Sequence, residues 1–360
     1  MKFLENVSLA EYTTFKIGGK AKYFCVVKNE EELYEALDFA KGKNTESLIM
    51  PFFILGGGSN ILVSDDGFDG LVVKMEMTGV SFEDGEKSDN KTDVGKILVT
   101  AQAGDNWDRL VAETVKKELW GLENLSGIPG TVGAAPVQDI GAYGAEAKDT
   151  IVSVRAIDST TGAARTFTNS ECQFSYRESF FKTAEGKKYI ITSVTFKLSK
   201  IPSPNLSYKD LKEYFSENGR EERDSLSSRP PSLSEIRKAV IEIRKGKFPE
   251  LSKVGTAGSF WKNPIISNQQ FEKLKIRYPN TPSFSFGDKI KIPLAWILDN
   301  VCGLKGYTKG PVSLWTNQPL VVVAEKGTSF KEIESLTCEV TNIVKQKTGI
   351  DIEKEVQYIA

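Results

Sequence analysis

Apolar and polar positions along the first part of the chain predict strands interleaved with a helix. Short apolar runs of strand length precede and follow a helical pattern over about residues 30–40, whose first turn is acidic. These runs cover residues 23–27, 52–55, 61–63 and 71–74. Because such elements bury their apolar faces against one another, we expect a small α/β unit here.

A half-buried strand is expected over residues 97–103, and an amphipathic helix follows it. Asp105 stands where its side chain could cap that helix, whose apolar residues fall on one stripe. The stripe consists of Trp107, Leu110, Val111, Thr114, Val115 and Leu119. Such a stripe favours packing in a core over a ligand site. Further strands are expected at 151–157 and 189–198.

Composition changes over residues 201–229, where prolines and a charged run predict a domain boundary. Beyond it, Ser232 with Glu235 and Ser329 with Glu332 have the spacing of capping boxes and predict two helices. We expect Gly246 and Pro249 to end the first of these helices. The remaining expected elements are a short helix at 292–301, a buried strand at 320–325 and a solvated edge strand at 351–360.

Charge and composition then narrow the classes of function. The 48 acidic and 47 basic residues nearly cancel, so no extended field favours nucleic acid or an anionic membrane. The chain contains no histidine, which excludes imidazole-based triads, histidine-containing metal sites and histidyl attachment of a flavin. Proton transfer must therefore use Glu, Asp, Lys, Tyr, Ser or Cys.

The cysteines and the apolar runs bear on the cellular compartment. Four scattered cysteines lack the spacing of a disulfide framework or a metal site. The first residues lack the apolar region of a signal peptide, and no apolar run reaches membrane-spanning length. We therefore expect a cytoplasmic protein with no bound metal and with neither nucleic acid nor membrane as a partner.

The segment from Gly127 to Gly144 is rich in glycine and alanine, almost uncharged, and stiffened by Pro129 and Pro136. Glycine destabilises helix and strand interiors, and the segment is too apolar for an ordinary linker. It is either a tight structural turn region or a cradle whose backbone amides hold an anion and whose small side chains admit a flat ring system. The length of the run favours a cofactor cradle.

Residues 56–60, Gly-Gly-Gly-Ser-Asn, form a second glycine-rich segment between two predicted strands. It is not a dinucleotide fingerprint, because Ile61 stands where a third glycine is needed and no helical pattern follows. It also lacks the Lys-Ser/Thr pair of a P-loop. A glycine turn and a phosphate-binding nest of backbone amides remain equal alternatives for this segment alone.

Two polar residues, Arg177 and Ser259, lie among aromatic or small neighbours. Arg177 is either a solvated loop residue stacked on a ring or the planar cation that a carboxylate or an enolate requires. Ser259 follows Gly258, but the Gly-x-Ser-x-Gly pattern is not matched and no histidine is present to activate a serine. This motif alone therefore favours a turn serine.

The order of the segments is more specific than any one of them. Gly56-Gly-Gly-Ser-Asn-Ile-Leu-Val-Ser-Asp65, the 127–144 segment, Tyr176-Arg-Glu-Ser-Phe-Phe-Lys182, Gly258-Ser-Phe-Trp-Lys-Asn-Pro264 and Glu355-Val356 follow one another along the chain. From Tyr12-Thr13-Thr14-Phe15 to the C-terminus, the sequence thereby resembles the UDP-N-acetylenolpyruvoylglucosamine reductase family, in its longer, type I branch.

The resemblance implies an α+β fold. A two-part FAD-binding module of the PCMH/vanillyl-alcohol-oxidase type would precede a C-terminal α/β substrate-binding domain. The implied divisions are FAD-binding subdomains at 1–77 and 78–222, a substrate domain at 223–349, and a strand at 350–360 that returns to the active site. The resemblance also implies a monomer.

The implied activity is that of a UDP-N-acetylmuramate dehydrogenase, an oxidoreductase of peptidoglycan precursor synthesis. NADPH would reduce non-covalently bound FAD, whose N5 would deliver hydride to C3 of the enolpyruvyl group of UDP-N-acetylglucosamine enolpyruvate. Protonation of C2 by Ser259 would then give UDP-N-acetylmuramate.

The resemblance assigns roles to individual residues. Arg177, Ser259 and Glu355 are implied to be catalytic. Residues implied to hold FAD are Gly56, Gly57, Gly58, Ser59, Asn60, Gly127, Pro129, Gly130, Gly133, Ala134 and Gly141. Residues implied to contact the substrate are Tyr143, Tyr176, Tyr208, Lys247, Asn263 and Gln318, with Lys247 on a phosphate and Tyr208 closing over the nucleotide.

The sequence departs from the family pattern at three positions. Asp139 stands where asparagine is common, Trp315 where relatives often have histidine, and Gln357 where arginine is frequent. None of these changes removes an implied catalytic group. Two competing hypotheses are another flavoprotein oxidase or dehydrogenase on the same scaffold and a non-catalytic nucleotide-binding module.

Overall fold

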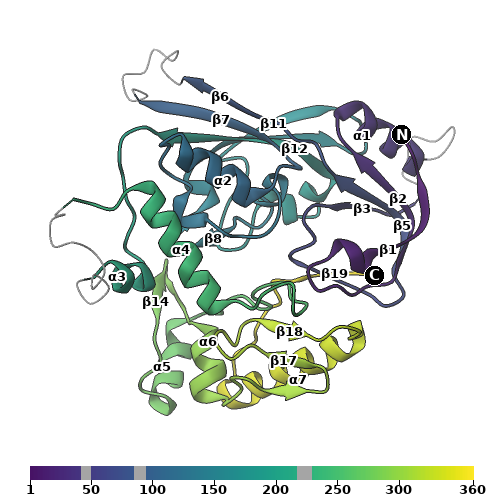
Figure 1. Ribbon diagram of the computed structural model, residues 1–360. Helices are drawn as coiled ribbons and strands as arrows, with labels where there is room; N and C mark the ends of the chain where they lie inside the picture. The colour runs from purple at the N-terminus through teal and green to yellow at the C-terminus, as the bar shows by residue number, and fades with distance from the viewer. Residues whose placement is uncertain (42–49, 85–94, 217–228) are drawn as a thin grey trace. The chain divides into compact units, whose positions relative to one another are not determined.

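The computed structural model describes residues 1–41, 50–84, 95–216 and 229–360 (Figure 1). The chain divides into two compact units, each assembled from separate stretches of sequence. Unit 1 comprises residues 1–4, 24–57 and 70–244, and unit 2 comprises residues 5–23, 58–69 and 245–360. The divisions at 77, 222 and 349 stay predictions, and residues 217–228 of the expected boundary segment lie outside the described residues.

The first sheet contains the strands predicted at 23–27, 52–55 and 71–74, together with β1 (Leu4–Ser8), which was not predicted. Its strand order is β1, β2 (Lys20–Val27), β5 (Phe68–Met75) and β3 (Phe52–Leu55). Strands β3 and β5 run parallel, with Phe52 opposite Leu71. Helix α1 (Glu30–Lys41) follows β2 and buries Leu33, Ala36, Leu37 and Ala40, as its periodicity predicts.

Unit 1 also contains a five-stranded antiparallel sheet with α2 (Trp107–Lys116) against it (Figure 1). The strand order is β11 (Ala164–Thr168), β10 (Ile151–Asp158), β12 (Tyr189–Ser199), β7 (Lys96–Gln102) and β6 (Val80–Asp84). The Trp107 ring on α2 lies 5.8 Å from that of Phe196 on β12. The apolar stripe of this helix is therefore core, as predicted.

The predicted cap of α2 is wrong by one residue. Asn106, not Asp105, is the N-cap, and its side-chain oxygen accepts a hydrogen bond from the Arg109 amide at 2.9 Å. The Asp105 carboxylate instead accepts from the amides of Gly79 and Gln102, at 3.0 and 3.1 Å. Aspartate and asparagine are both favoured N-cap residues, and the backbone places Asn106, not Asp105, at the N-cap of α2. The helix ends at Lys116, so Leu119 lies beyond it.

Helix α4 (Leu233–Lys247) begins at the predicted capping box. The Ser232 hydroxyl accepts from the Glu235 amide at 3.4 Å, and the Glu235 carboxylate accepts from the Ser232 amide at 2.8 Å. The helix ends at Lys247, between Gly246 and Pro249, the two residues predicted to end it. The shorter α3 (Lys209–Phe215) precedes it in the chain.

The capping box should make the stability of the protein depend on pH. The Ser232 amide bond, opposed by burial, lowers the pKa of Glu235 to about 2 from 4.5. A lowered pKa contributes stability above the unfolded value, and this contribution is lost as the pH falls through the folded value. Glu235→Gln should therefore lower the free energy of unfolding by about 1 kcal/mol at neutral pH and by almost nothing below about pH 2.

Denaturant titrations at several pH values would measure this difference. Glu272→Gln, at an exposed position inside α5 (Asn268–Arg277), is the control for loss of a helical charge. An equal loss of stability in the two variants, or a loss that does not vary with pH, would contradict the capping role.

Unit 2 surrounds its own apolar core. Its two three-stranded sheets have the orders β13-β15-β14 and β16-β17-β18. The strands are β13 (Ile265–Ile266), β15 (Lys289–Lys291), β14 (Phe284–Phe286), β16 (Thr308–Lys309), β17 (Val312–Leu314) and β18 (Val322–Ala324). Helix α7 (Phe330–Thr348) begins at the predicted box of Ser329 and Glu332 and contributes Ile333, Leu336, Val340 and Val344 to the core.

Two predicted elements of unit 2 differ in the structure. The helix expected at 292–301 is a single turn, α6 (Leu294–Trp296), followed by a π-helical turn over Ile297–Val301. The C-terminal segment is a strand only in β19 (Gln357–Ile359), which pairs in parallel with β4 (Ile61–Val63). The predicted alternation holds before it, since Ile352 and Val356 are buried while Glu353 is exposed.

The remaining elements are short. They are the 3₁₀ turns Leu9–Tyr12, Glu123–Leu125, Val132–Ala134, Ala147–Asp149, Phe180–Lys182 and Gly186–Lys188, and the strands β8 (Gly141–Ala142) and β9 (Ala145–Glu146). None of the helices in the described part of the chain combines the length and apolarity needed to cross a bilayer.

Candidate active site

Unit 2 brings Ser259 close to Glu355, although the two are far apart in the sequence. Ser259 forms a backbone bridge with Val321, and the Phe260 amide donates to the Leu320 carbonyl at 2.8 Å. On the other side, the Phe260 carbonyl accepts from the Glu355 amide at 2.8 Å. The 259–260 segment thus lies between the β17–β18 hairpin and the C-terminal segment, and both candidate side chains are half-buried.

Two aromatic side chains fix the segment that carries Ser259. Phe260 and Trp261 are completely buried, and their rings lie 4.9 Å apart. The Phe260 ring also meets that of Phe15 edge-on at 6.5 Å, and the Trp261 indole donates to the Thr341 hydroxyl at 3.3 Å. Because these anchors are in the core, the backbone at Ser259 has little freedom to move.

Asn60 connects the glycine-rich 56–60 segment to the C-terminal segment that carries Glu355. Its side-chain amide donates to the Glu355 carbonyl at 3.2 Å, and its own carbonyl accepts from the Gln357 amide at 3.0 Å. Gln357 acts here through its backbone, so this contact does not depend on which side chain stands there. Asn60 therefore positions Glu355, and its predicted contact with FAD stays a prediction.

The hairpin turn after β17 carries Gln318 and lies beside the end of α4. The Gln318 amide donates to the Trp315 carbonyl at 3.3 Å, and the Val321 amide donates to the Gln318 carbonyl at 2.9 Å. The Asn317 side chain donates to the Gly246 carbonyl at 2.8 Å, which places this turn next to the residue before Lys247. Unit 2 thus gathers Ser259, Gln318 and Lys247.

Asn263 has a structural role in addition to its predicted one. Its side-chain oxygen accepts from the Leu294 amide at 2.9 Å, at the start of α6. This bond satisfies an amide that the short helix leaves without an intrahelical partner. The predicted contact of Asn263 with substrate stays a prediction.

Arg177 lies in unit 1, at the tip of a tight turn. Ser175 and Glu178 exchange two backbone hydrogen bonds of 3.0 Å, and Arg177 between them has a φ of 57°. A positive φ is costly for a residue with a side chain and is found mostly where a site requires it. The Lys182 ammonium donates to the Arg177 carbonyl at 2.9 Å and holds the turn.

The guanidinium of Arg177 extends to the glycine-rich loop. Its two terminal nitrogens donate to the carbonyls of Asp139 and Gly141, at 3.3 and 3.2 Å. Its central carbon lies 5.7 Å from the centre of the Tyr176 ring. Arg177 thus contacts a ring and is held in a fixed orientation, and its predicted role toward a carboxylate or an enolate stays a prediction.

The predicted substrate tyrosines Tyr143 and Tyr208 meet edge-on in unit 1, with ring centres 5.4 Å apart. Tyr143 has a φ of 50°, and its carbonyl accepts from the Asn124 side chain at 2.8 Å. Burial, partly offset by the nearby Arg244, raises the pKa of the Tyr143 phenol to about 12. Tyr143 is therefore a neutral hydrogen-bonding group at physiological pH.

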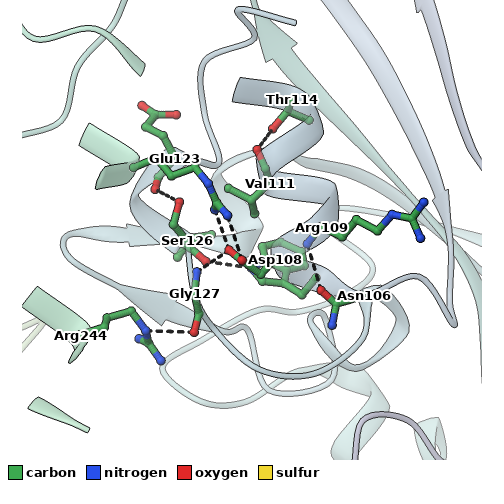
Figure 2. Close-up of polar contacts among 12 residues, drawn as sticks. Asn106, Asp108, Arg109, Val111, Thr114, Glu123, Ser126, Gly127 and Arg244 are labelled. Atoms are coloured by element: carbon green, nitrogen blue, oxygen red, sulfur yellow. Dashed lines mark hydrogen bonds and ion pairs between the residues drawn. The ribbon is translucent and has the colours of Figure 1, made fainter. Parts of the chain in front are cut away.

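Gly127, at the start of the glycine-rich loop, is held by charged residues on two helices (Figure 2). Its amide donates to the Asp108 carboxylate at 2.6 Å, and its carbonyl accepts from the Arg244 guanidinium at 3.0 Å. Arg237 donates two hydrogen bonds to Asp108, of 2.6 and 2.9 Å. Burial disfavours the charged carboxylate, but Arg237 and the Gly127 amide outweigh it and lower the pKa of Asp108.

The two glycine-rich segments pack backbone to backbone within unit 1. A Cβ on Gly57 would lie 2.8 Å from the Gly130 Cα, and one on Gly56 would lie 2.7 Å from the Thr131 hydroxyl. A Cβ on Gly133 would lie 2.6 Å from the Ala103 Cβ. The protein's own packing therefore requires these glycines, so the structural and functional alternatives for the two segments are compatible.

The same residues fit a pyrophosphate and a flat ring. Neither residues 56–60 nor 127–138 contain an acidic side chain, so backbone amides dominate the local field. Lys74 adds a cation, since its ammonium donates to the Gly56 carbonyl, and burial lowers the pKa of this ammonium. Pro129, Gly130 and Ala134 present no polar side chain that would compete with a ring system.

Sequence reasoning did not identify Lys74, Asp108, Arg237 and Arg244 as residues of the site. The sequence does contain a feature that could have indicated Lys74, because this lysine interrupts the otherwise apolar run Leu71-Val-Val-Lys-Met75. Arg237 and Arg244 lie seven positions apart on one helix, the spacing of one face. Their partner Asp108 comes from another helix, and nothing in the local pattern of either helix indicates the pairing.

Comparison with known proteins agrees with this geometry. Residues 21–168 match the FAD binding domain family, and residues 250–359 match the C-terminal domain of UDP-N-acetylenolpyruvoylglucosamine reductase. The fold is similar to that of the crystal structure of this reductase from Thermus caldophilus, with a TM-score of 0.65, 23% identity and full coverage of both chains. The protein is thus a flavoprotein of the α+β class, as predicted, with an FAD-binding module and a separate C-terminal domain.

Full-length relatives then specify the family. The sequence is 39% identical to UDP-N-acetylenolpyruvoylglucosamine reductase from Flavobacterium johnsoniae over 361 residues, which cover 100% of both chains. It is 39% identical to that of Bdellovibrio bacteriovorus over 356 residues, covering 99% of each chain. The chain belongs to the UDP-N-acetylenolpyruvoylglucosamine reductase family. It is an FAD-binding oxidoreductase of peptidoglycan synthesis.

Proposed function

We propose that this protein uses NADPH to reduce UDP-N-acetylglucosamine enolpyruvate to UDP-N-acetylmuramate. The observation that supports this reaction most directly is the placement of Ser259 beside Glu355, on a segment held between two others. FAD, when bound, would supply the hydride that adds to C3 of the enolpyruvyl group. The proposal includes a monomeric enzyme in the cytoplasm. The burial of Cys25, Cys172 and Cys302 as free thiols supports a reducing compartment.

Arg177 stabilises the charge that the reaction creates. Hydride addition to C3 leaves negative charge on C2 and on the adjacent carboxylate. A guanidinium already oriented by the Asp139 and Gly141 carbonyls needs little reorganisation to bind that charge, and such preorganised donors are often the largest catalytic contribution. The strained turn at Arg177 supports this role, since strain is tolerated where function requires it.

Ser259 and Glu355 act on the enolate that hydride addition leaves. The Ser259 hydroxyl gives its proton to C2, a strongly basic carbon, and a nearby lysine stabilises the resulting alkoxide. Glu355, when protonated, donates a hydrogen bond to the enolate oxygen. A chain without histidine needs groups of this kind for proton transfer. The backbone bonds at Phe260 keep both residues in one place while their side chains stay half-buried.

Absorption spectra and enzyme turnover test the proposal together. Purified protein should show a flavin spectrum, and it should oxidise NADPH only when the enolpyruvyl nucleotide is present. A flavin-loaded protein that ignores this nucleotide but oxidises another substrate would indicate a different flavoprotein oxidase or dehydrogenase. A protein that binds the nucleotide without turnover would indicate a non-catalytic binding module.

Tyr208→Phe should weaken substrate binding more than FAD binding. We propose that the Tyr208 hydroxyl donates a hydrogen bond to the nucleotide. A hydrogen bond to a charged group contributes about 1.5–3 kcal/mol, or about 10–100-fold in affinity. The edge contact of its ring with Tyr143 does not need the hydroxyl. Titration of the nucleotide and of FAD would measure the two affinities.

Tyr214→Phe, on helix α3, is the matched control, because its hydroxyl bonds Glu242 instead. It should leave the nucleotide affinity within about two-fold of wild type, as expected for a surface change. An unchanged nucleotide affinity in Tyr208→Phe would contradict the closing role of Tyr208.

A further inference from the structure

The loop that holds Arg177 contains an ion pair between a buried carboxylate and a partly exposed lysine, which the proposed reaction does not use. The Asp139 side chain is fully buried, and its carboxylate lies 3.2 Å from the Lys148 ammonium. The other carboxylate oxygen accepts from the Lys148 amide at 2.9 Å. Asp139 has a φ of 43°, so the backbone itself is strained at this point. Lys148 also pairs with Glu146, which is one-third exposed.

Asp139 holds Arg177 through its carbonyl oxygen, and its carboxylate is bound elsewhere. The carbonyls of Asp139 and Gly141 accept from the guanidinium, and a neutral carbonyl leaves the charge of its donor in place. The strands β8 and β9 and the bond from the Ala147 amide to the Ile140 carbonyl, of 2.8 Å, connect this loop to Lys148. One compact hairpin thus contains both the support of Arg177 and the partner of Asp139.

We propose that Lys148 is a positioning residue: its ammonium neutralises the Asp139 carboxylate, so that the loop orients Arg177 without presenting an uncompensated negative charge to it. The inference rests on the proposed role of Arg177 and deepens it. Asparagine at position 139 would need no such partner, because its side chain is neutral. Asp139 and Lys148 therefore act as a pair.

The physical reason is the sensitivity of a buried site to one charge. Burial raises the pKa of the Asp139 carboxyl even with Lys148 beside it. If Lys148 were removed, the carboxylate would have no positive partner and would still lie beside the loop carbonyls that orient the guanidinium. Its ionised form would compete with the substrate carboxylate for Arg177, since electrostatic attraction is strong where water is scarce. The charged groups that face Asp139 are Lys148, Glu146 and, through the loop, Arg177.

A double-mutant cycle tests the inference on the FAD-loaded enzyme. Lys148→Met should slow the oxidation of pre-reduced enzyme by the enolpyruvyl nucleotide about 10-fold or more, with NADPH-driven reduction within about two-fold of wild type. Asp139→Asn alone should stay within about three-fold of wild type. The double variant should recover to a similar level, because the charge that needed Lys148 is gone.

The pH profile separates this role from a merely structural one. The defect of Lys148→Met should grow as the pH rises and Asp139 ionises, whereas the ratio of the double variant to wild type should stay flat. Glu146→Gln is the matched control, because it also removes a partner of Lys148 but leaves Asp139 paired, and it should be close to wild type. Lys148→Arg should retain activity.

A Lys148→Met variant as fast as wild type would overturn the inference, and so would any one of three further results. They are a double variant as slow as Lys148→Met, a pH-independent defect in Lys148→Met, and a defect in Asp139→Asn as large as that of Lys148→Met. Lys148→Gln replaces Lys148→Met if the latter does not retain FAD. Arg177→Met separates this inference from the proposed function. If the nucleotide oxidises reduced Arg177→Met at the wild-type rate, the proposed role of Arg177 is wrong. If this oxidation is slow in Arg177→Met but normal in Lys148→Met, only the positioning role of Lys148 is wrong.

Discussion

Replacing Ser259 by alanine should slow the oxidation of reduced enzyme by the enolpyruvyl nucleotide by about 10²–10⁴-fold, the usual contribution of a positioned proton donor. Reduction by NADPH should stay within about two-fold of wild type, because that half-reaction needs no proton at C2. The fold should tolerate the change. Ser259 pairs with Val321 through its backbone, and the anchoring side chains belong to Phe260 and Trp261.

Stopped-flow measurement of the two half-reactions would give both rates. Ser313→Ala is the matched control, since Ser313 is also half-buried and lies in β17, on the hairpin beside which the Ser259 segment runs. It should leave both rates within about two-fold of wild type. If Ser259→Ala slowed both half-reactions equally, Ser259 would act by supporting the structure, and another group would have to protonate C2.

The sequence predicted those elements whose signals are local. The capping boxes of Ser232 and Ser329 mark the starts of α4 and α7, because a hydroxyl and a carboxylate three residues apart satisfy the first amides of a helix. The apolar stripe of α2 and the early strands were equally clear. The error at Asp105 has the same origin, since two adjacent residues could both cap α2 and only the entry of the chain selects Asn106.

The site could be predicted only in part, because its geometry depends on contacts between distant segments. Ser259 alone favoured a turn serine, and the structure gives it a distinct environment through Leu320 and Glu355. The resemblance brought in Glu355, but it could not show that Asn60 holds the Glu355 carbonyl. Nor does any local pattern connect Asp108 to Arg237 and Gly127, since each of these residues is ordinary in its own segment.

The two glycine-rich segments combine a packing role with a predicted role in binding FAD. Read as sequence, glycine at 56–58 and 127–133 allowed a structural turn or a cofactor cradle. In the structure, a Cβ on Gly57 would lie 2.8 Å from the Gly130 Cα, so a side chain at Gly57 would separate the two segments. The predicted binding of FAD by the backbone amides of both segments requires this contact to hold. Cofactor affinity should therefore depend on the packing between the segments.

Gly57→Ala should accordingly raise the FAD dissociation constant at least about 10-fold, in addition to a loss of stability of about 1–3 kcal/mol typical of overpacking. The added Cβ would lie 2.8 Å from the Gly130 Cα, and a backbone atom cannot rotate away as the end of a flexible side chain can.

Gly104→Ala is the matched control in the same unit. Its Cβ would lie 2.6 Å from the Met77 carbonyl oxygen, at a position with no predicted contact to FAD. Flavin fluorescence on titration of apoprotein, with thermal unfolding of both variants, would measure the two effects. Equal losses of FAD affinity in the two variants would show that Gly57 acts through stability alone.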